Sequence, residues 1–280
     1  MRVAVYQCES RPTDVAANLE RLAGTARDAA AQGAELVVCP EMFLTGYNIG
    51  ASNARRLAEM RGGSSAQRIA EIAREHGLAV LYGYPERAAE DSAPEEAVFN
   101  AVQLIGADGH SLANYRKTHL FGELDRSMFS ASAAEPSLVD LNGWSLGMLI
   151  CYDVEFPENA RRLAVAGADL ILAPTANMIP YDVVATTIVP ARAFENQVYV
   201  AYANYCGNEG EIQYCGLSCV ASPDGTDAAR AGRSESLIVA DLDRESMAAS
   251  RSINTYLADR RPELYRSLAA PAQGNGPPAL

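Results

Sequence analysis

Residues Ser145–Pro157 read Ser-Leu-Gly-Met-Leu-Ile-Cys-Tyr-Asp-Val-Glu-Phe-Pro. This stretch predicts a central strand of the fold and the start of the helix that follows it. Its first part, Leu146–Ile150, is a short apolar run that is typical of a strand buried on both faces, although a buried helical segment has the same pattern. Pro157 then opens a helical pattern that runs to Ala166, since proline is well suited to a first helical turn. Cys151 therefore lies between a buried strand and a helix.

The position of Cys151 has two interpretations. A thiol at the end of a strand can be held rigidly beside a pocket, where backbone N–H groups of the following turn stabilise an oxyanion. Free cysteines are also among the most buried residue types, so a small hydrophobic residue of the core is the more common role for a cysteine. Position alone does not decide between a nucleophile and a core residue.

The composition is that of an acidic globular chain. Its 280 residues are 49% hydrophobic and 21% charged, which is enough for one large core or two small ones. The net charge of −12 argues against nucleic acid or an anionic membrane as a partner, because both require a basic surface. No apolar run approaches the length of a membrane span, and the N-terminus has no signal-peptide pattern. We therefore expect a cytoplasmic protein.

The cysteines and histidines do not have the spacing of a metal site. In a reduced compartment the six cysteines are expected to be thiols rather than disulfides. Cys215 and Cys219 are four residues apart, but no second pair follows and the three histidines are scattered. We therefore expect no zinc site.

The first part of the chain alternates between strand and helix patterns. Valine-rich Arg2–Cys8 predicts a strand, Val15–Gln32 predicts a helix with Asp14 as its N-cap, and Leu36–Cys39 predicts a second strand. This β-α-β opening indicates a layered α/β fold. Leu57–His76 predicts a helix that is interrupted near Gly62-Gly63. Further strands are predicted at Leu78–Tyr84, Val98–Ile105, Ser111–Tyr115, Pro136–Leu141, Leu170–Ala173, Val198–Asn204, Gln213–Ala221 and Ser236–Ala240.

The end of the chain has the composition of a tail. Ala269–Leu280 is rich in proline and glycine and cannot bury a core. We expect one domain over residues 1–262 and an extended or disordered C-terminal tail over residues 263–280.

Two charged residues also follow predicted strands. Glu41 comes two residues after Leu36–Cys39, where a buried carboxylate is costly unless it is paired or protonated. Lys117 follows Ser111–Tyr115 in the same way. Each has a simpler interpretation, because most single glutamates lie in surface loops and Arg116-Lys117 reads equally as a solvated charge pair.

Three residue types at strand ends supply the parts of an acyl-transfer site. Strand ends on one rim of a layered sheet converge on a cleft, so Glu41, Lys117 and Cys151 are expected to meet there. The carboxylate would take the thiol proton, the thiolate would attack a carbonyl carbon, and the ammonium would stabilise the oxyanion. No histidine is required for these roles.

Three segments resemble the signature blocks of the nitrilase superfamily of carbon–nitrogen hydrolases, in the family's order and with its separations. They are Cys-Pro-Glu-Met-Phe-Leu-Thr-Gly-Tyr (39–47), Tyr-Arg-Lys-Thr-His-Leu-Phe (115–121) and Ile-Cys-Tyr-Asp-Val-Glu-Phe-Pro-Glu (150–158). The resemblance extends over residues 1–262. It implies a four-layer α-β-β-α sandwich and a homodimer or higher homo-oligomer.

The resemblance also implies a role for each matching residue. Cys151 would be the nucleophile and Glu41 the general base, while Lys117 and the backbone N–H of Tyr152 would form the oxyanion hole. Glu123 matches the additional glutamate that helps to position the lysine or the substrate. The expected substrate-binding residues are Tyr47, Tyr152, Asp153 and Asn177, and the expected supporting residues near the site are Arg192, Glu195 and Asn196.

The implied reaction is the hydrolysis of an amide through a cysteine thioester, with water as second substrate and without a metal or organic cofactor. A narrower resemblance is to the amidase branch that contains 5-aminopentanamidase (delta-aminovaleramidase) and R-stereoselective amidases. It rests on four further segments: Leu-Thr-Gly-Tyr-Asn-Ile-Gly (44–50), Phe-Gly-Glu-Leu-Asp-Arg-Ser-Met-Phe-Ser (121–130), Pro-Thr-Ala-Asn-Met (174–178) and Tyr-Ala-Asn-Tyr-Cys-Gly (202–207). Members of this branch hydrolyse small primary amides rather than nitriles.

The remote ammonium of a substrate such as 5-aminopentanamide would need a carboxylate or an aromatic partner. The candidate carboxylates are Asp125, Asp153, Glu155, Asp182, Glu209 and Glu211. Three alternatives stay open: an N-carbamoyl hydrolase, an N-acyltransferase with the same nucleophile, and a non-catalytic binding protein on the same fold.

Overall fold

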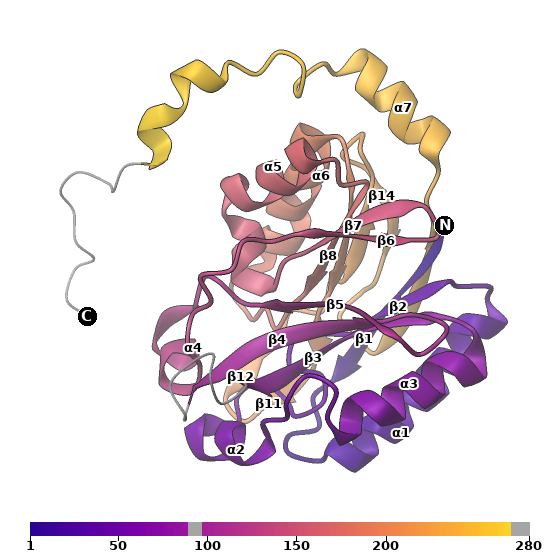
Figure 1. The fold of residues 1–280 in the computed structure, drawn as a ribbon, viewed down its shortest axis with the longest axis vertical. Coiled ribbons are helices and arrows are strands. Elements are labelled where there is room, and N and C mark those ends of the chain that lie inside the picture. Colours follow the sequence, from indigo (N-terminus) through magenta and orange to yellow (C-terminus); the bar gives the residue numbers. More distant parts are fainter. Residues whose placement is uncertain (89–96, 270–280) are drawn as a thin grey trace.

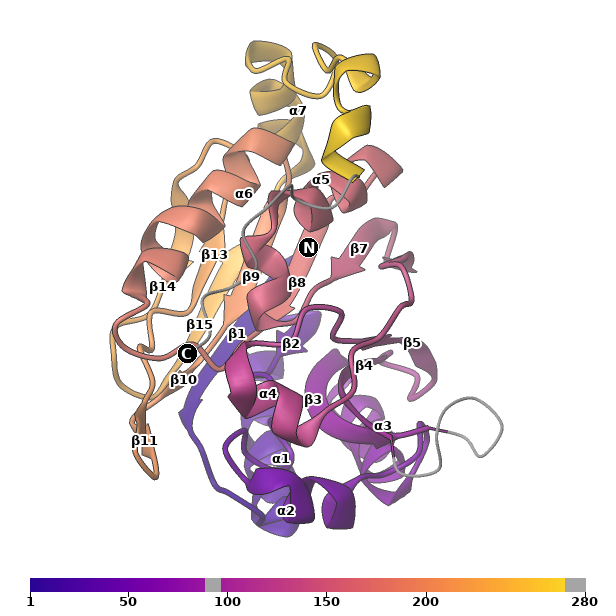
Figure 2. The same ribbon diagram turned by 90° about the vertical axis from the view of Figure 1, so that its left-hand side faces the viewer.

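Two β-sheets pack face to face, and helices cover the outer face of each (Figure 1 and Figure 2). The computed structural model describes residues 1–88 and 97–269 of the chain. The order of the layers is α-β-β-α, so the predicted α/β class and four-layer sandwich are confirmed.

The first sheet is built from the N-terminal part of the chain. Its path runs β10-β1-β2-β3-β4-β5, and β15 pairs with β1 in antiparallel orientation. Neighbours β1, β2 and β3 are parallel, because helical connections return the chain to the same edge before each new strand. The strands are β1 (Arg2–Glu9), β2 (Leu36–Val38), β3 (Ala79–Arg87), β4 (Val98–Ile105), β5 (Ser111–Arg116), β10 (Tyr205–Cys206) and β15 (Ser236–Asp241).

The second sheet has six strands in the order β14-β13-β9-β8-β7-β6. Its central strands β7, β8 and β9 are parallel, whereas β6 and β7 form a hairpin around Asn142-Gly143. The strands are β6 (Leu138–Leu141), β7 (Trp144–Met148), β8 (Leu170–Pro174), β9 (Tyr199–Ala203), β13 (Cys219–Ala221) and β14 (Asp227–Arg230). A separate hairpin consists of β11 (Asn208–Glu209) and β12 (Ile212–Gln213).

The helices lie outside the sheets. Those that pack on the first sheet include α1 and α3, and those on the second sheet are α5 and α6 (Figure 2). The α-helices are α1 (Val15–Ala31), α2 (Gly50–Leu57), α3 (Ser64–His76), α4 (Gly122–Met128), α5 (Pro157–Ala166), α6 (Val189–Asn196) and α7 (Arg244–Ile253). Shorter elements are the 3₁₀-helices η1 (Cys151–Glu155), η3 (Pro262–Leu264) and η4 (Arg266–Ala269) and the π-helix η2 (Val184–Ile188).

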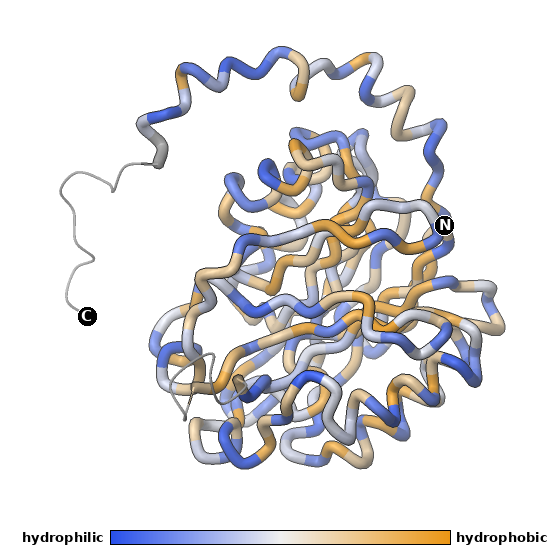
Figure 3. The backbone as a smooth tube through the Cα atoms, viewed as in Figure 1, coloured by the Kyte–Doolittle hydropathy of each residue, from blue (hydrophilic) through white to orange (hydrophobic). Residues whose placement is uncertain are grey.

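Apolar side chains fill the space between each pair of layers. Hydrophobic segments run through the interior of the body, where the strands of Figure 1 lie, and many hydrophilic segments lie on its outside (Figure 3). Val5 and Leu81 of the first sheet belong to the same buried cluster as Leu146 and Leu172 of the second. Because β2, β7 and β8 are buried on both faces, the polar residues that follow them are held by rigid elements.

One predicted helical feature agrees with the structure, and a second agrees only in part. Asp14 caps α1, since its carboxylate accepts a hydrogen bond from the N–H of Ala17 at 3.0 Å. The helix predicted over Leu57–His76 forms only as Ser64–His76, after the two glycines. Before them the prediction is wrong, because α2 already ends at Leu57 and Glu59 forms a β-bridge with Glu86.

The C-terminal part leaves the body of the molecule as an arm, here residues 254–269 after α7 (Figure 1). Of the expected tail over residues 263–280, the part up to residue 269 forms 3₁₀ turns rather than extended chain, and residues 270–280 lie outside the described residues. Within the described ranges, no helix has both the length and the apolar character needed to cross a membrane.

Candidate active site

Cys151 stands at a sharp bend between a strand and a 3₁₀-helix. Strand β7 ends at Met148, and η1 begins at Cys151 with φ of 48°. A non-glycine residue in this left-handed region costs on the order of 1–3 kcal/mol, so the rest of the fold must hold it there. Thr175 and the backbone N–H of Ala176, just past β8, lie near the thiol and lower its pKa. The ends of the parallel strands β7 and β8 therefore meet at the cysteine.

Glu41 lies at the end of β2 and is fully buried. Its Oε1 accepts hydrogen bonds from Lys117 Nζ and from Asn100 Nδ2, each at 2.7 Å. Its Oε2 is also buried, and within the part of the chain that the structure describes no group hydrogen-bonds to it. One carboxylate oxygen is thus fixed and the other is free to exchange a proton.

Lys117 comes directly after β5 and is as buried as Glu41. Its Nζ donates to Glu41 Oε1 and to Asp125 Oδ2, both at 2.7 Å. It is the only lysine in the sequence, since all other basic side chains are arginine or histidine. That count is a sequence signal that distinguishes Lys117 from an ordinary surface cation.

The buried charges change the proton affinities of the site. Burial raises the pKa of the Cys151 thiol, the Glu41 charge raises it further, and the Lys117 ammonium opposes both. Burial also raises the pKa of Glu41, more than Lys117 lowers it. Burial disfavours the Lys117 ammonium, but Glu41 and Asp125 outweigh that effect and raise its pKa well above the usual value. A neutral thiol therefore lies within the electrostatic field of a carboxylate and an ammonium.

The carboxylate that positions the lysine is Asp125 and not Glu123. Glu123 is exposed on α4, whereas Asp125 is fully buried one half-turn further along the helix. Asp125 accepts hydrogen bonds from Lys117 Nζ, from the Tyr47 hydroxyl at 2.8 Å and from the Phe121 N–H at 2.8 Å. The expected contact between Glu123 and Lys117 is therefore wrong, and sequence reasoning missed the role of Asp125 as its partner.

Asp153, an expected substrate-binding residue, is used entirely within the protein. Its carboxylate accepts from the Tyr115 hydroxyl at 2.9 Å, the Thr118 hydroxyl at 2.8 Å and the Ile150 N–H at 3.2 Å. It also contacts the N–H and Nδ1 of His119. Asp153 therefore joins the segment after β5, which contains Lys117, to the bend that contains Cys151.

The other expected substrate-binding residues are distributed around the site. Tyr47 is buried, and its ring lies 5.8 Å from Lys117 Nζ. Tyr152 is half-buried beside Cys151, with its ring centroid 5.4 Å from that of Phe121. Asn177 donates to the Tyr181 carbonyl at 2.9 Å and so shapes the loop after β8. Of these three, Tyr152 keeps its side chain partly open.

Arg192 supports the site from α6, as expected. Its guanidinium donates to the carbonyls of Val154 at 3.0 Å and Glu155 at 2.6 Å, which are the last residues of η1. It also pairs with Glu195 at 3.0 Å. The end of the 3₁₀-helix that starts at Cys151 is thereby anchored to the helical layer.

Among residues 1–88 and 97–269, no group of three His, Cys, Asp or Glu side chains is arranged to hold a metal ion.

Comparison with known proteins identifies the family. Residues 2–252 match the carbon–nitrogen hydrolase family. A Pseudomonas protegens protein named hydrolase in pqqF 5'region is 61% identical over 96% of this chain and 92% of its own length. An (R)-stereoselective amidase from Pseudomonas sp. is 33% identical over 93% and 92% of the two chains.

Solved structures give the same result. An amidase from Nesterenkonia sp. has a TM-score of 0.85 with 34% identity over 96% of each chain. A mutant of that amidase in complex with butyramide has a TM-score of 0.81 with 34% identity over 95% and 96% of the chains. The predicted membership of the nitrilase superfamily is confirmed. The chain belongs to the carbon–nitrogen hydrolase family and is an enzyme that hydrolyses carbon–nitrogen bonds.

Proposed function

We propose that the enzyme is an amidase that hydrolyses a small aliphatic primary amide through a thioester on Cys151. The observation that carries this proposal is the asymmetry of Glu41. Its Oε1 is held by Lys117 and Asn100, and its buried Oε2 has no hydrogen-bond partner among the described residues. A carboxylate with a raised pKa and one free oxygen suits a general base that takes a proton from a neutral thiol.

The first half-reaction forms the acyl-enzyme. The thiol proton passes to Glu41 as Cys151 sulfur attacks the amide carbonyl carbon. The tetrahedral intermediate collapses with cleavage of the C–N bond, and the nitrogen takes the proton from Glu41 and leaves as ammonia. In the second half-reaction Glu41 takes a proton from water, which attacks the thioester. The carboxylic acid leaves, and the proton returns to the sulfur.

Lys117 is arranged to stabilise the oxyanion of both intermediates. An ammonium has three N–H donors, and two of them are engaged by Glu41 and Asp125. The third is available for the substrate oxygen. The N–H of Tyr152 lies in the first turn of η1, where N–H groups have no partner within the helix, and it would supply the second donor.

The substrate that we propose is an ω-amino amide such as 5-aminopentanamide. The names of the relatives support the coarser choice of an amide, and the butyramide bound by the Nesterenkonia amidase mutant is an aliphatic primary amide of similar length. An R-stereoselective amidase and an N-carbamoyl hydrolase are the alternatives. Ammonia release from a panel of ω-amino amides, chiral amides and N-carbamoyl compounds distinguishes the three.

The nucleophile is tested by mass spectrometry and turnover together. Incubation with an amide substrate should add the acyl mass to the wild-type protein at Cys151. Cys151→Ala should lose both the adduct and ammonia release while its thermal unfolding stays cooperative. Turnover by Cys151→Ala at a rate near that of the wild type would contradict the proposal, and so would an acyl adduct on another cysteine.

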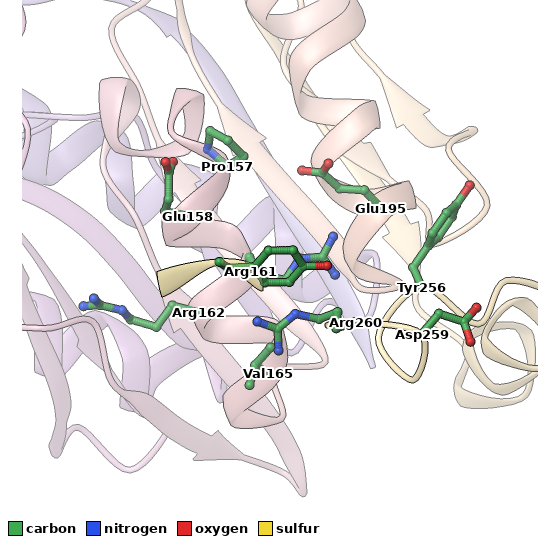
Figure 4. A pocket seen from close by; sticks show the side chains of 10 residues that line it. Pro157, Glu158, Arg161, Arg162, Val165, Glu195, Tyr256, Asp259 and Arg260 are labelled. Carbon is green, nitrogen blue, oxygen red and sulfur yellow. The ribbon is translucent and has the colours of Figure 1, made fainter. Parts of the chain in front are cut away.

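We further propose that the enzyme forms a homodimer through the face of α5 and α6. A cavity of about 650 Å³ separates these helices from the arm (Figure 4). Its lining contains none of Glu41, Lys117 and Cys151. It includes three arginines and three carboxylates, so opposite charges could meet across a two-fold axis. They are Arg161, Arg162, Arg260, Glu158, Glu195 and Asp259.

Exposed apolar side chains on the same face support this interface. Val165 on α5 is 54% exposed, and Tyr256 and Tyr265 on the arm are 47% and 39% exposed. Light scattering coupled to size exclusion should give twice the chain mass, and Val165→Asp should lower it towards one chain mass. A monomeric wild-type protein would contradict the dimer.

We also propose one catalytic domain over residues 1–262 and a cytoplasmic location. The six free thiols support the cytoplasmic location, because a reducing compartment keeps thiols unpaired.

A further inference from the structure

The substrate's ammonium needs a carboxylate that the protein does not already use, and most candidates fail this condition. Asp125 accepts from Lys117, Tyr47 and Phe121, and Asp153 has at least four protein donors. Glu209 is buried, and its Oε2 accepts from the Tyr214 hydroxyl and contacts the Tyr47 N–H at 3.3 Å. Its Oε1 has no hydrogen-bond partner among the described residues, but the residue is only 3% exposed. Asp125 and Asp153 are thus used by the protein itself, and Glu209 is closed off from solvent.

Two of the remaining candidates lie at the surface. Asp182 pairs with the Arg233 guanidinium at 2.9 Å. Glu211 is exposed on the hairpin of β11 and β12. Surface carboxylates that are paired or fully hydrated gain little from a further cation.

Glu155 differs from all of these. It is half-buried at the end of η1, and no described residue donates a hydrogen bond to its carboxylate. Arg192 Nη2 donates to the Glu155 backbone carbonyl instead, and Arg192 Nη1 donates to Glu195. Burial raises the pKa of Glu155, while Lys117 and Arg192 lower it, so the carboxylate lies within the field of the catalytic ammonium. A half-buried anion without a partner is stabilised by any cation that reaches it.

The spacing along η1 allows one substrate to reach both residues. A rise of about 2.0 Å per residue puts the Cα of Glu155 roughly 8 Å along the axis from that of Cys151. Extended 5-aminopentanamide spans about 6 Å from carbonyl carbon to ammonium nitrogen at ordinary bond lengths. Residues four apart leave a 3₁₀-helix about 120° apart around its axis, so the substrate would run obliquely along η1 from one side chain to the other.

Aromatic side chains stand next to this position. Side chains three residues apart in a 3₁₀-helix eclipse one another, so Glu155 and Tyr152 share a face of η1. The ring of Phe121 lies 5.4 Å from that of Tyr152 and 5.9 Å from that of Tyr181. We name Phe121, Tyr152 and Tyr181 the aromatic rim. Aromatic faces attract ammonium groups and pack against methylene chains.

We propose that Glu155, beside the aromatic rim, binds the terminal ammonium of the substrate and thereby determines specificity for ω-amino amides. This inference rests on the proposed amidase function for its substrate. The carboxylate supplies a charge-assisted hydrogen bond, and the rim packs against the methylene chain between the amide and the ammonium.

The experiment compares 5-aminopentanamide with uncharged pentanamide in four proteins. The ratio of their kcat/KM values cancels any general damage to the site. Glu155→Gln should lower this ratio by about 10- to 100-fold, the effect of losing one charge-assisted hydrogen bond. Glu211→Gln is the matched control, and Asp182→Asn tests the other surface carboxylate. Both should keep the wild-type ratio.

Two outcomes of the kinetic comparison overturn the inference. One is an unchanged ratio in Glu155→Gln, and the other is a loss of preference in Asp182→Asn or Glu211→Gln instead.

A binding measurement tests whether Glu155 binds the ammonium even if the protein hydrolyses neither amide. Calorimetry with Cys151→Ala should give a lower Kd for 5-aminopentanamide than for pentanamide, and the double variant Cys151→Ala/Glu155→Gln should lose that difference. If the wild-type protein hydrolyses neither amide, the proposed function fails while the binding comparison still decides the role of Glu155. Equal affinities of both amides for Cys151→Ala would refute it.

Discussion

Lys117 Nζ lies 2.7 Å from Asp125 Oδ2, and the same nitrogen lies 2.7 Å from Glu41 Oε1. Two buried carboxylates therefore share one ammonium, so the group as a whole carries a negative charge inside the protein. Tyr47 and Phe121 donate to Asp125, which spreads that charge over further donors. The arrangement fixes the lysine from two sides and leaves one of its N–H groups for a ligand.

Asp125→Asn should impair catalysis far more than Glu123→Gln. The amide removes one of the two charges that orient Lys117 and brings an N–H₂ group towards the ammonium. We expect kcat to fall by at least about 100-fold, the scale of losing one oxyanion-hole donor. Glu123 is exposed, so Glu123→Gln should stay within about twofold of the wild type. Steady-state kinetics on one amide checks both, and the reverse order of effects would restore Glu123 as the residue that positions the lysine.

The ionisation of Lys117 is accessible to NMR, because the sequence contains no other lysine. Protein labelled with ¹⁵N at lysine Nζ should give a single side-chain resonance. The pKa of Lys117 is raised well above the usual 10.5, since Glu41 and Asp125 outweigh the effect of burial. The resonance should therefore remain that of an ammonium at pH 10.5. Glu41→Gln should lower this pKa, and Glu123→Gln should not. Titration of the wild-type resonance below the usual lysine pKa would show that the ion-pair network does not form.

Lys117→Met should destabilise the protein in a pH-dependent manner. The ammonium lowers the pKa of Glu41, so its removal leaves burial and Asp125 to raise that pKa further. The folded variant then holds a proton that the unfolded chain releases above the ordinary glutamate pKa of about 4.3. Its stability is consequently greatest below that pH and falls as the pH rises towards the folded-state pKa.

Denaturant unfolding of Lys117→Met and wild type at pH 5 and pH 8 measures this effect. At pH 8 the variant should lose about 3–5 kcal/mol of unfolding free energy, the cost of removing one partner of a buried pair. At pH 5 the loss should be smaller, with a slope of at most about 1.4 kcal/mol per pH unit for one carboxyl. The same loss at both pH values would mean that Glu41 does not take up a proton.

The sequence predicts which strand ends meet, but it does not predict which side chains face the cleft. Apolar runs before Glu41, Lys117 and Cys151 indicate buried strands, and parallel strands bring their ends to one edge. Glu123 and Asp125 both follow Lys117 closely in the chain, and Glu123 is the nearer of the two. The two residues are about 200° apart around the axis of α4 and so lie on opposite faces of the helix. Which of them is buried depends on where the helix begins, because that sets which face packs against the protein.

Asp153 illustrates a second limit of the sequence. A carboxylate beside the nucleophile suggests a ligand contact, and among its described donors the one nearby in the sequence is the Ile150 N–H. Its donors Tyr115 and Thr118 lie more than thirty residues earlier and come into reach only when β5 and β7 are placed in facing sheets. The importance of Lys117, in contrast, can be inferred from the sequence alone, because it is the only lysine.

Gly83 supports the Glu41 turn by its lack of a side chain. A Cβ at this position of β3 would lie 2.2 Å from the Met42 nitrogen and 2.9 Å from the Glu41 carbonyl carbon. Gly83→Ala should therefore push the turn away and lower the unfolding free energy by about 1–3 kcal/mol. Because a displacement of about 1 Å in a catalytic group costs on the order of 100-fold in rate, kcat should fall more than stability suggests.

Gly24→Ala is the matched control for this substitution. Gly24 lies within α1, and a Cβ there would meet no atom within 4 Å. The change should raise stability by about 0.5–1 kcal/mol through helix propensity and leave kcat unaltered. Thermal unfolding and kinetics on the two variants separate a local effect on Glu41 from a general effect of added methyl groups. If Gly83→Ala kept wild-type kcat, the close approach of β3 to the Glu41 turn would not be what holds the general base in place.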